Sequence, residues 1–341
     1  MDCTATVLHY IYSLQFMWLL ATLIIQPASP FGAGVVCQQV PGLEMTEVQK
    51  GLCKDNPNII HIMFEYAVKV FKHHCHDSFK HNQWTCRGID PPMFATVQKF
   101  LTLETREAAF VYALTSAAVV HTIADRLTED NAKCATLDRS LLPEGQKWFG
   151  CSPDIHYSIL FAKQFMDSRV DNENVKFKTF VHRNSEIGRL AVLDHMRKSC
   201  ECAGVKCDSC KWQLPDMDKV VEILREKYEK SAHVSIVRTS AIPLLIQDNE
   251  TKEKVDQSKM IHFSRSLDYC ERNDEYLVHG VSGRSCTMVK GAPDSCDNLC
   301  CGRGHKTRTV TQQKTCNCNF EWCCRVVCDT CEVKVEEHKC K

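Results

Sequence analysis

The sequence of 341 residues lacks several features by which common classes of protein are recognised. Its 42 lysines and arginines are matched by 42 aspartates and glutamates, so no field of the whole chain attracts nucleic acid. It contains no Gly-x-Ser-x-Gly elbow of a hydrolase and no phosphate-binding loop. Its bulky N-terminal run, residues 9–25, is shorter than the ~20 apolar residues that span a membrane. These absences argue against a nucleic-acid-binding protein, a nucleotide-dependent enzyme and an integral membrane protein.

Cysteine is present in excess, with 23 residues, of which eleven lie from Cys286 onward. So many thiols would oxidise or bind metal in a reducing cytosol, so the composition indicates a secreted protein held together by disulfides. Residues 1–34 fit a signal peptide, because small residues follow the apolar run, although no Lys or Arg precedes it. An uncleaved membrane anchor is the alternative. Removal of this segment would also remove Cys3 and leave 22 cysteines, an even number.

The uneven spacing of the cysteines predicts two domains. Between residues 87 and 199 there are only Cys134 and Cys151, so an ordinary apolar core must hold an N-terminal domain, residues 35–245. Apolar residues at helical spacing predict helices over the ranges 58–74, 92–127, 158–167, 185–197 and 217–230. The second of these is apolar on all sides over residues 108–120 and is therefore expected at the centre of the core.

The remainder of the chain differs in composition. Residues 246–260 are predicted to be a charged, solvated linker, and Asn249 begins a glycosylation sequon within it. Residues 261–341 are too poor in Leu and Ile for a large core, and alternating segments at 307–311 and 325–327 predict β-hairpins stabilised by disulfides. The expected fold class is therefore α+β.

Two alternative chemistries are suggested by some of these residues. Zinc could bind the cysteines at 316, 318, 323, 324, 328 and 331, or the cluster His73, His74, Cys75, His76 and His81. A phospholipase-type helix, C-C-x-x-H-D, resembles the segment from Cys300 to Lys306. Here His305 is one place late, Lys306 stands where Asp is needed, and two glycines disfavour a helix. We therefore expect no catalytic residue, no cofactor and no metal, with a zinc-binding matrix protein or a phospholipase-type enzyme as remote alternatives.

Several short motifs occur in a distinctive order. They are Gln83-Trp84-Thr85-Cys86, residues 106–113 (REAAFVYA), residues 268–273 (DYCERN), residues 300–304 (CCGRG), residues 307–310 (TRTV) and Trp322-Cys323-Cys324. From about Cys37 to Lys341 the chain resembles the Wnt family of secreted signalling ligands. The resemblance implies a two-domain fold: a helical domain that includes a disulfide-closed hairpin at residues 200–212, then a cysteine-knot-like domain with a projecting hairpin at residues 316–331. It also implies a role in development and cell fate.

The resemblance implies a set of disulfides. The pairs are Cys75–Cys86, Cys134–Cys151, Cys200–Cys210, Cys202–Cys207, Cys270–Cys301, Cys286–Cys296, Cys300–Cys340, Cys316–Cys331, Cys318–Cys328 and the vicinal pair Cys323–Cys324. Cys37 and Cys53 are then left to each other. A further bridge that most members have near Leu127 and Lys133 lacks both of its cysteines here.

In the Wnt family the projecting hairpin contacts the cysteine-rich domain of a Frizzled receptor. The matching residues here are Asn319, Phe320, Glu321, Trp322, Cys323, Cys324, Arg325 and Val326. An exposed Phe and Trp on a rigid turn would supply large apolar area at little entropic cost. In the alternative interpretation Trp322 folds back onto its own hairpin.

The sequence departs from the family at the lipid-bearing hairpin, where most members attach palmitoleate to a serine. The loop between Cys202 and Cys207 is two residues shorter than usual, and Lys206 occupies the slot of that serine. Ser209 and Ser282 are the weak alternatives. We therefore expect a divergent member without the lipid, similar to the WntD-like proteins of insects, and without a stable membrane anchor.

Further partners are suggested more weakly. A basic stretch, expected to bind sulfated glycosaminoglycan such as heparan sulfate, comprises Arg303, His305, Lys306, Arg308 and Lys314, with a merely solvated strand as the alternative. In the family an LRP-type co-receptor docks near the segment that matches residues 214–258. The expected location is the extracellular space or matrix. Whether the chain is an agonist, a Frizzled-binding antagonist or feedback inhibitor, or a matrix protein stays open.

Overall fold

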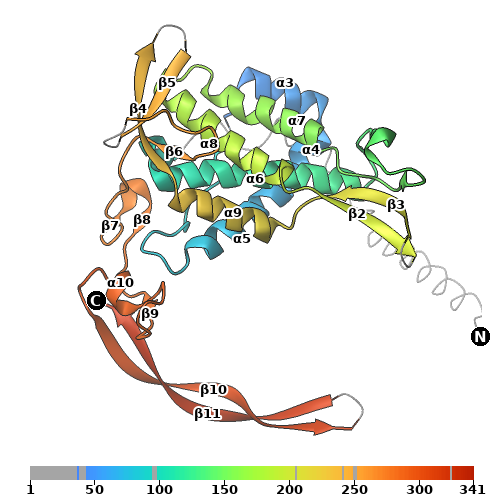
Figure 1. Cartoon of the computed structure of the whole chain (residues 1–341). Coiled ribbons are helices and arrows are strands. Elements are labelled where there is room, and N and C mark those ends of the chain that lie inside the picture. Colours follow the sequence, from blue (N-terminus) through green and yellow to red (C-terminus); the bar gives the residue numbers. More distant parts are fainter. Residues whose placement is uncertain are drawn as a thin grey trace, which may run out of the picture.

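The computed structural model describes residues 37, 44–93, 98–203, 206–239, 242–248, 252–322 and 325–341. The expected signal peptide, the Asn249 sequon and the Cys323–Cys324 bridge lie outside the described residues. Figure 1 shows a group of helices at one end of the molecule and a long two-stranded ribbon that projects away from it at the other.

The helices of the N-terminal region pack around one central helix. They are α3 (Glu47–Asp55), α4 (Pro57–Ile62), a π-helical turn (Met63–Ala67), α5 (Val68–Phe79), α6 (Arg106–Glu129), α7 (Ile155–Asp167), α8 (Val175–Leu193) and α9 (Met217–Glu229). Short 3-10 helices occupy Lys99–Leu103, Arg139–Leu141, Ser168–Val170 and Asp274–Tyr276, and α10 (Cys296–Leu299) lies in the C-terminal region. In Figure 1, α6 runs through the middle of the group.

The central helix α6 is the apolar segment that the sequence predicted for the core. It packs against α5, α7, α8 and α9. Among the described residues α6 alone is long and apolar enough to cross a bilayer, but 94% of its most apolar window is buried inside the protein, which is typical of a core helix. Its contact with α8 is close, since a Cβ built at Gly188 would lie 1.9 Å from the Ala113 carbonyl oxygen. Only glycine therefore fits this crossing.

Two predicted helices were wrong at their ends. The helix expected from Pro92 begins at Arg106, because Thr105 accepts a hydrogen bond from the Ala108 N–H and Glu104 adopts a left-handed φ of 54°. The helix expected from Ser185 begins ten residues earlier, where Asn174 caps the Phe177 N–H at 2.9 Å. Its C-terminal end is also earlier, at Leu193. Local caps set these ends, whereas apolar periodicity locates only the middle of a helix.

The strands form four small sheets. In the order of pairing, the first sheet is β1 (Lys147–Trp148), β3 (Lys206–Gln213) and β2 (Arg197–Ala203), and the second is β5 (Ile242–Gln247), β4 (Ala232–Thr239) and β6 (Ile261–His262). The third consists of β7 (Arg272–Asn273) and β8 (Val278–His279). The fourth is β10 (His305–Glu321), β11 (Arg325–Cys340) and β9 (Ser285–Cys286). The β10–β11 pair is antiparallel and makes the ribbon of Figure 1. Because β9 pairs with only two residues of β11, most of the ribbon has two strands.

The segment predicted as a solvated linker, residues 246–260, is only partly so. Those of its charged residues that the structure describes are exposed, but Val255 and Met260 are buried. The Val255 N–H donates to the Leu245 carbonyl at 3.2 Å, and the Gln247 N–H donates to the Glu253 carbonyl at 2.9 Å. The segment thus folds back on the β4–β5 hairpin, where these hydrogen bonds and the burial of Val255 hold it.

Ten disulfides join cysteines of the described residues, and every one is among the eleven expected pairs. They are Cys37–Cys53, Cys75–Cys86, Cys134–Cys151, Cys200–Cys210, Cys202–Cys207, Cys270–Cys301, Cys286–Cys296, Cys300–Cys340, Cys316–Cys331 and Cys318–Cys328. With few exceptions these pairs close short loops.

Polar contacts join the helical region to the C-terminal region. The buried carboxylate of Glu107 on α6 accepts hydrogen bonds from Tyr228 at 3.0 Å and from Ser266 at 2.8 Å. Burial, with the Glu107 charge beside it, raises the pKa of Tyr228, so that its hydroxyl stays a donor. The guanidinium of Arg284 donates to the Gln83 carbonyl at 3.0 Å. These bonds fix where the ribbon emerges.

Candidate functional site

The tip of the ribbon carries the residues that the sequence assigned to a receptor. Phe320 lies directly opposite Val326, so these two side chains share one face of the ribbon. Glu321 lies opposite Arg325, and because neighbouring residues of a strand alternate between faces, this pair is on the other face. The predicted set therefore divides into an apolar face and a charged face.

The apolar side chains at the tip are unusually open to solvent. Trp322 is 96% exposed, Phe320 71% and Val326 61%. The alternative in which Trp322 folds back onto its hairpin is therefore wrong. Val327, 38% exposed and opposite Asn319, was missed by the sequence reasoning. The adjacent pair Val326 and Val327 could have indicated that Val327 is exposed. Neighbouring residues of a strand point to opposite faces, so the two valines place one apolar side chain on each face of the ribbon.

Two disulfides brace the ribbon just below the tip. Cys316–Cys331 and Cys318–Cys328 cross-link β10 to β11. The register shifts between Cys316 and Asn319, where Asn317 has a left-handed φ of 48°. Such a bulge increases local twist and turns the strand beyond it. The tip is thus held by covalent bonds where no second layer covers it.

The predicted basic stretch is divided by ion pairs. Arg308 pairs with Glu337 across the strands, and Arg303 pairs with Glu271, both at 2.6 Å. Lys306 and Lys314 are exposed on the same face as Arg308, and no ion pair of the described residues includes either one. His305 is half-buried on the opposite face. Two lysines, not five basic residues, therefore remain free for an anionic partner.

The shortened hairpin consists of β2 and β3. Cys200 lies opposite Cys210 and Cys202 opposite Cys207, and the pairing continues to Ala203 and Lys206. Ser209 is half-buried between the two bridges, whereas Ser282 is exposed in the other region of the chain. The structure thus places Lys206 and Ser209 in one hairpin. Ser282 lies between β8 and β9 and belongs to neither strand of this hairpin.

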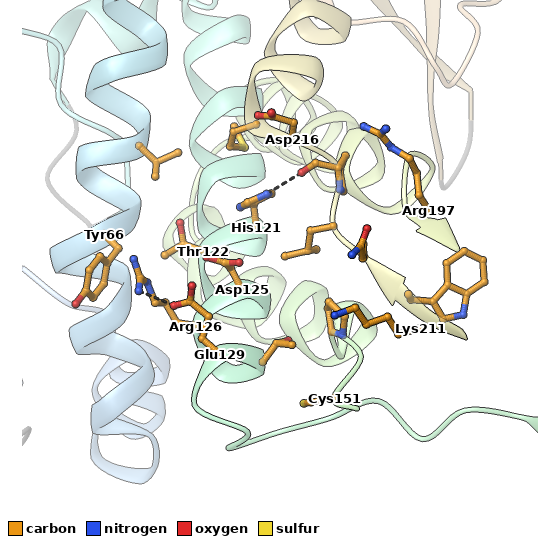
Figure 2. Close-up of a pocket in the computed structure, with 18 of the residues that line it drawn as sticks. Tyr66, His121, Thr122, Asp125, Arg126, Glu129, Cys151, Arg197, Lys211 and Asp216 are labelled. Atoms are coloured by element: carbon orange, nitrogen blue, oxygen red, sulfur yellow. Dashed lines mark hydrogen bonds and ion pairs between the residues drawn. The ribbon is translucent and has the colours of Figure 1, made fainter. Parts of the chain in front are cut away.

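A cavity of about 940 Å³ lies at the stem of this hairpin (Figure 2). One wall comes from α6 and carries His121, Thr122 and Asp125, and the facing wall carries Arg197 and Lys211 from β2 and β3. The ring of His121 is held by the Pro215 carbonyl, 2.9 Å from Nε2. The sequence could not indicate this cavity, because it is lined by residues of α5, α6, the segment around Cys151, β2, β3 and the start of α9.

The described cysteines of the zinc alternatives are all in disulfides and offer no thiolate. Cys316, Cys318, Cys328 and Cys331 are all in disulfides, as is Cys75. The sulfurs of Cys286, Cys296 and Cys300 lie within 4.8 Å of one another, but each is also bonded in a bridge and offers no thiolate.

The histidines around Cys75 lie near carboxylates instead. The distances are 3.7 Å for His73 to Asp77, 3.4 Å for His74 to Asp218 and 3.5 Å for His81 to Asp294. Burial lowers the pKa of His74, with the neighbouring His73 acting in the same direction. Three histidines of this cluster therefore have an acidic neighbour.

The phospholipase-type helix is absent. Helix α10 ends at Leu299, and Cys301, Gly302 and Gly304 have positive φ before β10 begins at His305. His305 and Lys306 therefore lie in a strand, on opposite faces, and cannot form the helical His-Asp pair of that enzyme class.

The fold is α+β, with a helical domain and a disulfide-rich β-ribbon domain. The model of the Wnt family matches residues 41–341, and the chain belongs to this family. A chain in the structure of human WLS in complex with WNT8A is similar, with 23% identity over 84% of this chain and 94% of that one, at a TM-score of 0.58. This likeness shows the shared fold. The N-terminal domain-linker of Drosophila WntD matches with 14% identity over 62% of this chain and 98% of that one, at a TM-score of 0.39. The protein is a Wnt-type signalling ligand, and secretion is typical of its family.

Proposed function

We propose that this ligand binds the cysteine-rich domain of a Frizzled receptor through the tip of its β10–β11 ribbon, and that it does so without an attached lipid. The observation that carries the proposal is the exposure of Trp322, Phe320 and Val326 on a disulfide-braced tip. Large aromatic side chains held in place before binding are typical of binding hot spots.

The two faces of the tip suit different parts of one interface. Phe320 and Val326 would fill an apolar centre, while Glu321 and Arg325 on the other face would belong to a polar rim. Since the ribbon is already rigid, little conformational entropy is lost when it docks.

The proposal that no lipid is attached rests on the hairpin of β2 and β3. Lys206 occupies the position of the serine that is acylated in most members. Ser209 lies between two disulfides whose cysteines are only 10 and 5 residues apart in the sequence. Without an acyl chain, which contributes ~0.8 kcal/mol per buried methylene, receptor affinity depends on protein contacts alone.

Binding of the secreted chain to a Frizzled cysteine-rich domain tests the receptor site. Trp322→Ala should weaken binding by about 30-fold or more, the loss of about 2 kcal/mol that marks a hot spot. Leu141→Ala is the matched control, because Leu141 is also an exposed apolar residue but lies in the helical region. Equal affinities of Trp322→Ala and wild type would refute the assignment.

The intact mass of the secreted protein tests the lipid. We expect the mass of the polypeptide and any glycan, with no palmitoleate adduct. If an adduct is found, peptide mapping distinguishes Ser209 from Ser282, and either result would contradict the proposal. A pathway reporter assay, with and without an acylated Wnt ligand, then separates an agonist from an antagonist.

A sulfated glycosaminoglycan is the further partner that we propose for the ribbon, through Lys306 and Lys314. Heparin retention should fall when both lysines are changed to Gln. It should change little for Arg308→Gln, because Glu337 already neutralises that residue.

A further inference from the structure

The cavity at the stem of the β2–β3 hairpin has a polar wall that the receptor function does not use. On α6, His121, Thr122 and Asp125 line the cavity at spacings of three and four residues, so their side chains are neighbours on one face of the helix. Figure 2 shows the three side chains on the same side of the cavity. The helix before them, residues 108–120, is buried. The buried helix thus presents polar groups where it meets the cavity.

Thr122 differs from the other threonines of this helix. The hydroxyls of Thr115 and Thr128 donate to the carbonyls four residues earlier, at 2.7 and 2.6 Å. Thr122 is only 4% exposed, and its Oγ1 has no hydrogen-bond partner among the described residues. A buried hydroxyl without a partner costs free energy, and a polar group of a ligand in the cavity would recover it.

The other two groups of this wall are hydrogen-bond acceptors. A carbonyl can only accept, so the contact of His121 Nε2 with the Pro215 carbonyl at 2.9 Å puts a proton on Nε2 and leaves the lone pair of the neutral ring on Nδ1. Asp125 is half-buried, and its carboxylate is in no ion pair or hydrogen bond among the residues that the structure describes. An imidazole nitrogen, a hydroxyl and a carboxylate match the three N–H donors of a primary ammonium group.

The cations beside this wall have other partners. Arg126 pairs with Glu129 at 2.6 Å, and Lys69 lies 3.8 Å from Glu65. Within the described parts of the chain, no lysine or arginine forms an ion pair with Asp125. This carboxylate is therefore available to a cation that enters the cavity.

The facing wall carries the opposite charge. Arg197 of β2 and Lys211 of β3 line the cavity, and neither forms an ion pair with another described residue. Asp216, a further acid of the lining, is engaged as the cap of α9, where it accepts from the Asp218 N–H at 3.1 Å. The lining also includes apolar side chains, namely Val70, Pro153, Leu214 and Met217. The cavity thus offers acceptors on one wall, cationic donors on the other and an apolar surface for the body of a ligand.

We propose that this cavity binds a small zwitterion with a primary ammonium group and a carboxylate, such as a free amino acid or a short peptide. The ammonium group donates to His121, Thr122 and Asp125. The carboxylate accepts from Arg197 and Lys211. The volume of about 940 Å³ suits a small molecule, and a few charged groups in an otherwise mixed lining fix its orientation. This site is separate from the receptor-binding tip of the ribbon.

Calorimetric titration of the full, oxidised chain tests the class of ligand. The probes are alanine, 6-aminohexanoate and triglycine, in which the two charges lie at increasing separation. We expect one equivalent of at least one of them to bind. The amide of that probe and its N-acetyl derivative each lack one charge and should bind at least about 10-fold more weakly, because one set of charged hydrogen bonds is lost. Binding of none of the three probes, or equal affinity of a probe and its one-charge derivatives, would overturn the proposal.

Variants assign the two walls. Asp125→Asn and Lys211→Gln should each weaken binding of the zwitterion by about 10-fold or more. Thr122→Val should also weaken it but should not lower the melting temperature of the free protein, because the hydroxyl has no partner to lose. The matched control is Asp130→Asn, which changes an exposed carboxylate at the end of α6 outside the cavity and should bind as wild type does. Trp322→Ala should also bind as wild type. Unchanged affinity in both Asp125→Asn and Lys211→Gln, or an equal loss in Asp130→Asn, would contradict the assignment.

Discussion

The helical region and the ribbon are stabilised by different interactions. Around α6, residues such as Phe110, Val119 and Phe180 are fully buried, and dispersion and the hydrophobic effect hold the helices together. The ribbon has two strands over most of its length, no layer of the described residues covers it, and its side chains are largely exposed. Disulfides and the ladder of hydrogen bonds replace the missing core there.

This difference shows why the large apolar side chains of the tip can remain available. In the helical region an aromatic residue such as Trp84 is needed for stability and is therefore covered. At the tip, the covalent bridges hold the backbone without help from the side chains, so Trp322 can stay in solvent. The predictions below test this division between packing and cross-linking.

The largest expected effect separates two tryptophans. Trp84 packs against Phe79, with centroids 4.4 Å apart, and against Phe100, so Trp84→Ala should lower the free energy of unfolding by about 3–5 kcal/mol. Trp322→Ala should change it by less than about 0.5 kcal/mol. Urea unfolding followed by circular dichroism measures both, and similar losses in the two variants would break the comparison.

Removal of a bridge should act on one region only. The double change Cys316→Ser with Cys331→Ser opens a bridge with a sequence separation of 15 residues, for which loop entropy predicts a local loss of about 3 kcal/mol. Proteolysis of the ribbon should accelerate while the melting temperature of the helices stays constant. The matched control, Cys134→Ser with Cys151→Ser, should instead lower that melting temperature, since this pair lies in the helical region.

Acid should weaken the junction of the two regions through His262. Burial lowers the pKa of His262 to about 4, and His233 and Arg106 act in the same direction, while Glu107 opposes them. Between pH 6.5 and 4 the unfolded chain therefore binds more protons than the folded one, so stability falls as the pH is lowered through this window. The expected loss is about 1–2 kcal/mol after allowance for partial exposure. Thermal melts at pH 7.5 and 4.5 measure it, and His262→Gln should flatten the difference; an unchanged slope would contradict this origin.

The smallest effect concerns a helix end in the packed region. Thr46 caps α3, since its hydroxyl accepts from the Gln49 N–H at 3.2 Å while Gln49 Oε1 accepts from the Thr46 N–H at 3.1 Å. Thr46→Ala should cost about 1 kcal/mol, and Thr46→Ser should restore most of it. Equal losses for Thr46→Ser and Thr46→Ala would show that packing of the γ-methyl group, which both variants lack, matters and the cap does not.

Much of the fold was predictable from short-range patterns and the family resemblance. The all-round apolar segment of α6 indicated a buried helix, and the motifs around Trp84, Tyr269 and Cys300 supplied the disulfide pairs that the structure contains. The start of α8 was missed because its cap, Asn174, precedes a stretch with weak apolar periodicity. The composition of the charged segment around Val255 predicts solvent exposure, because composition does not show which apolar residues of a segment are buried.

The candidate site divides in the same way. The sequence by itself determined which residues stand at the tip of the ribbon and that a lysine replaces the serine of the short hairpin, because residue identity and loop length are properties of the chain. Only the tertiary structure decided that Phe320 and Val326 share a face, that Arg308 is neutralised by Glu337, and that His305 meets His338. The physical reason is register: which residues face each other across two strands depends on the bulge, the bridges and the ladder, and a shift of one residue would exchange the two faces.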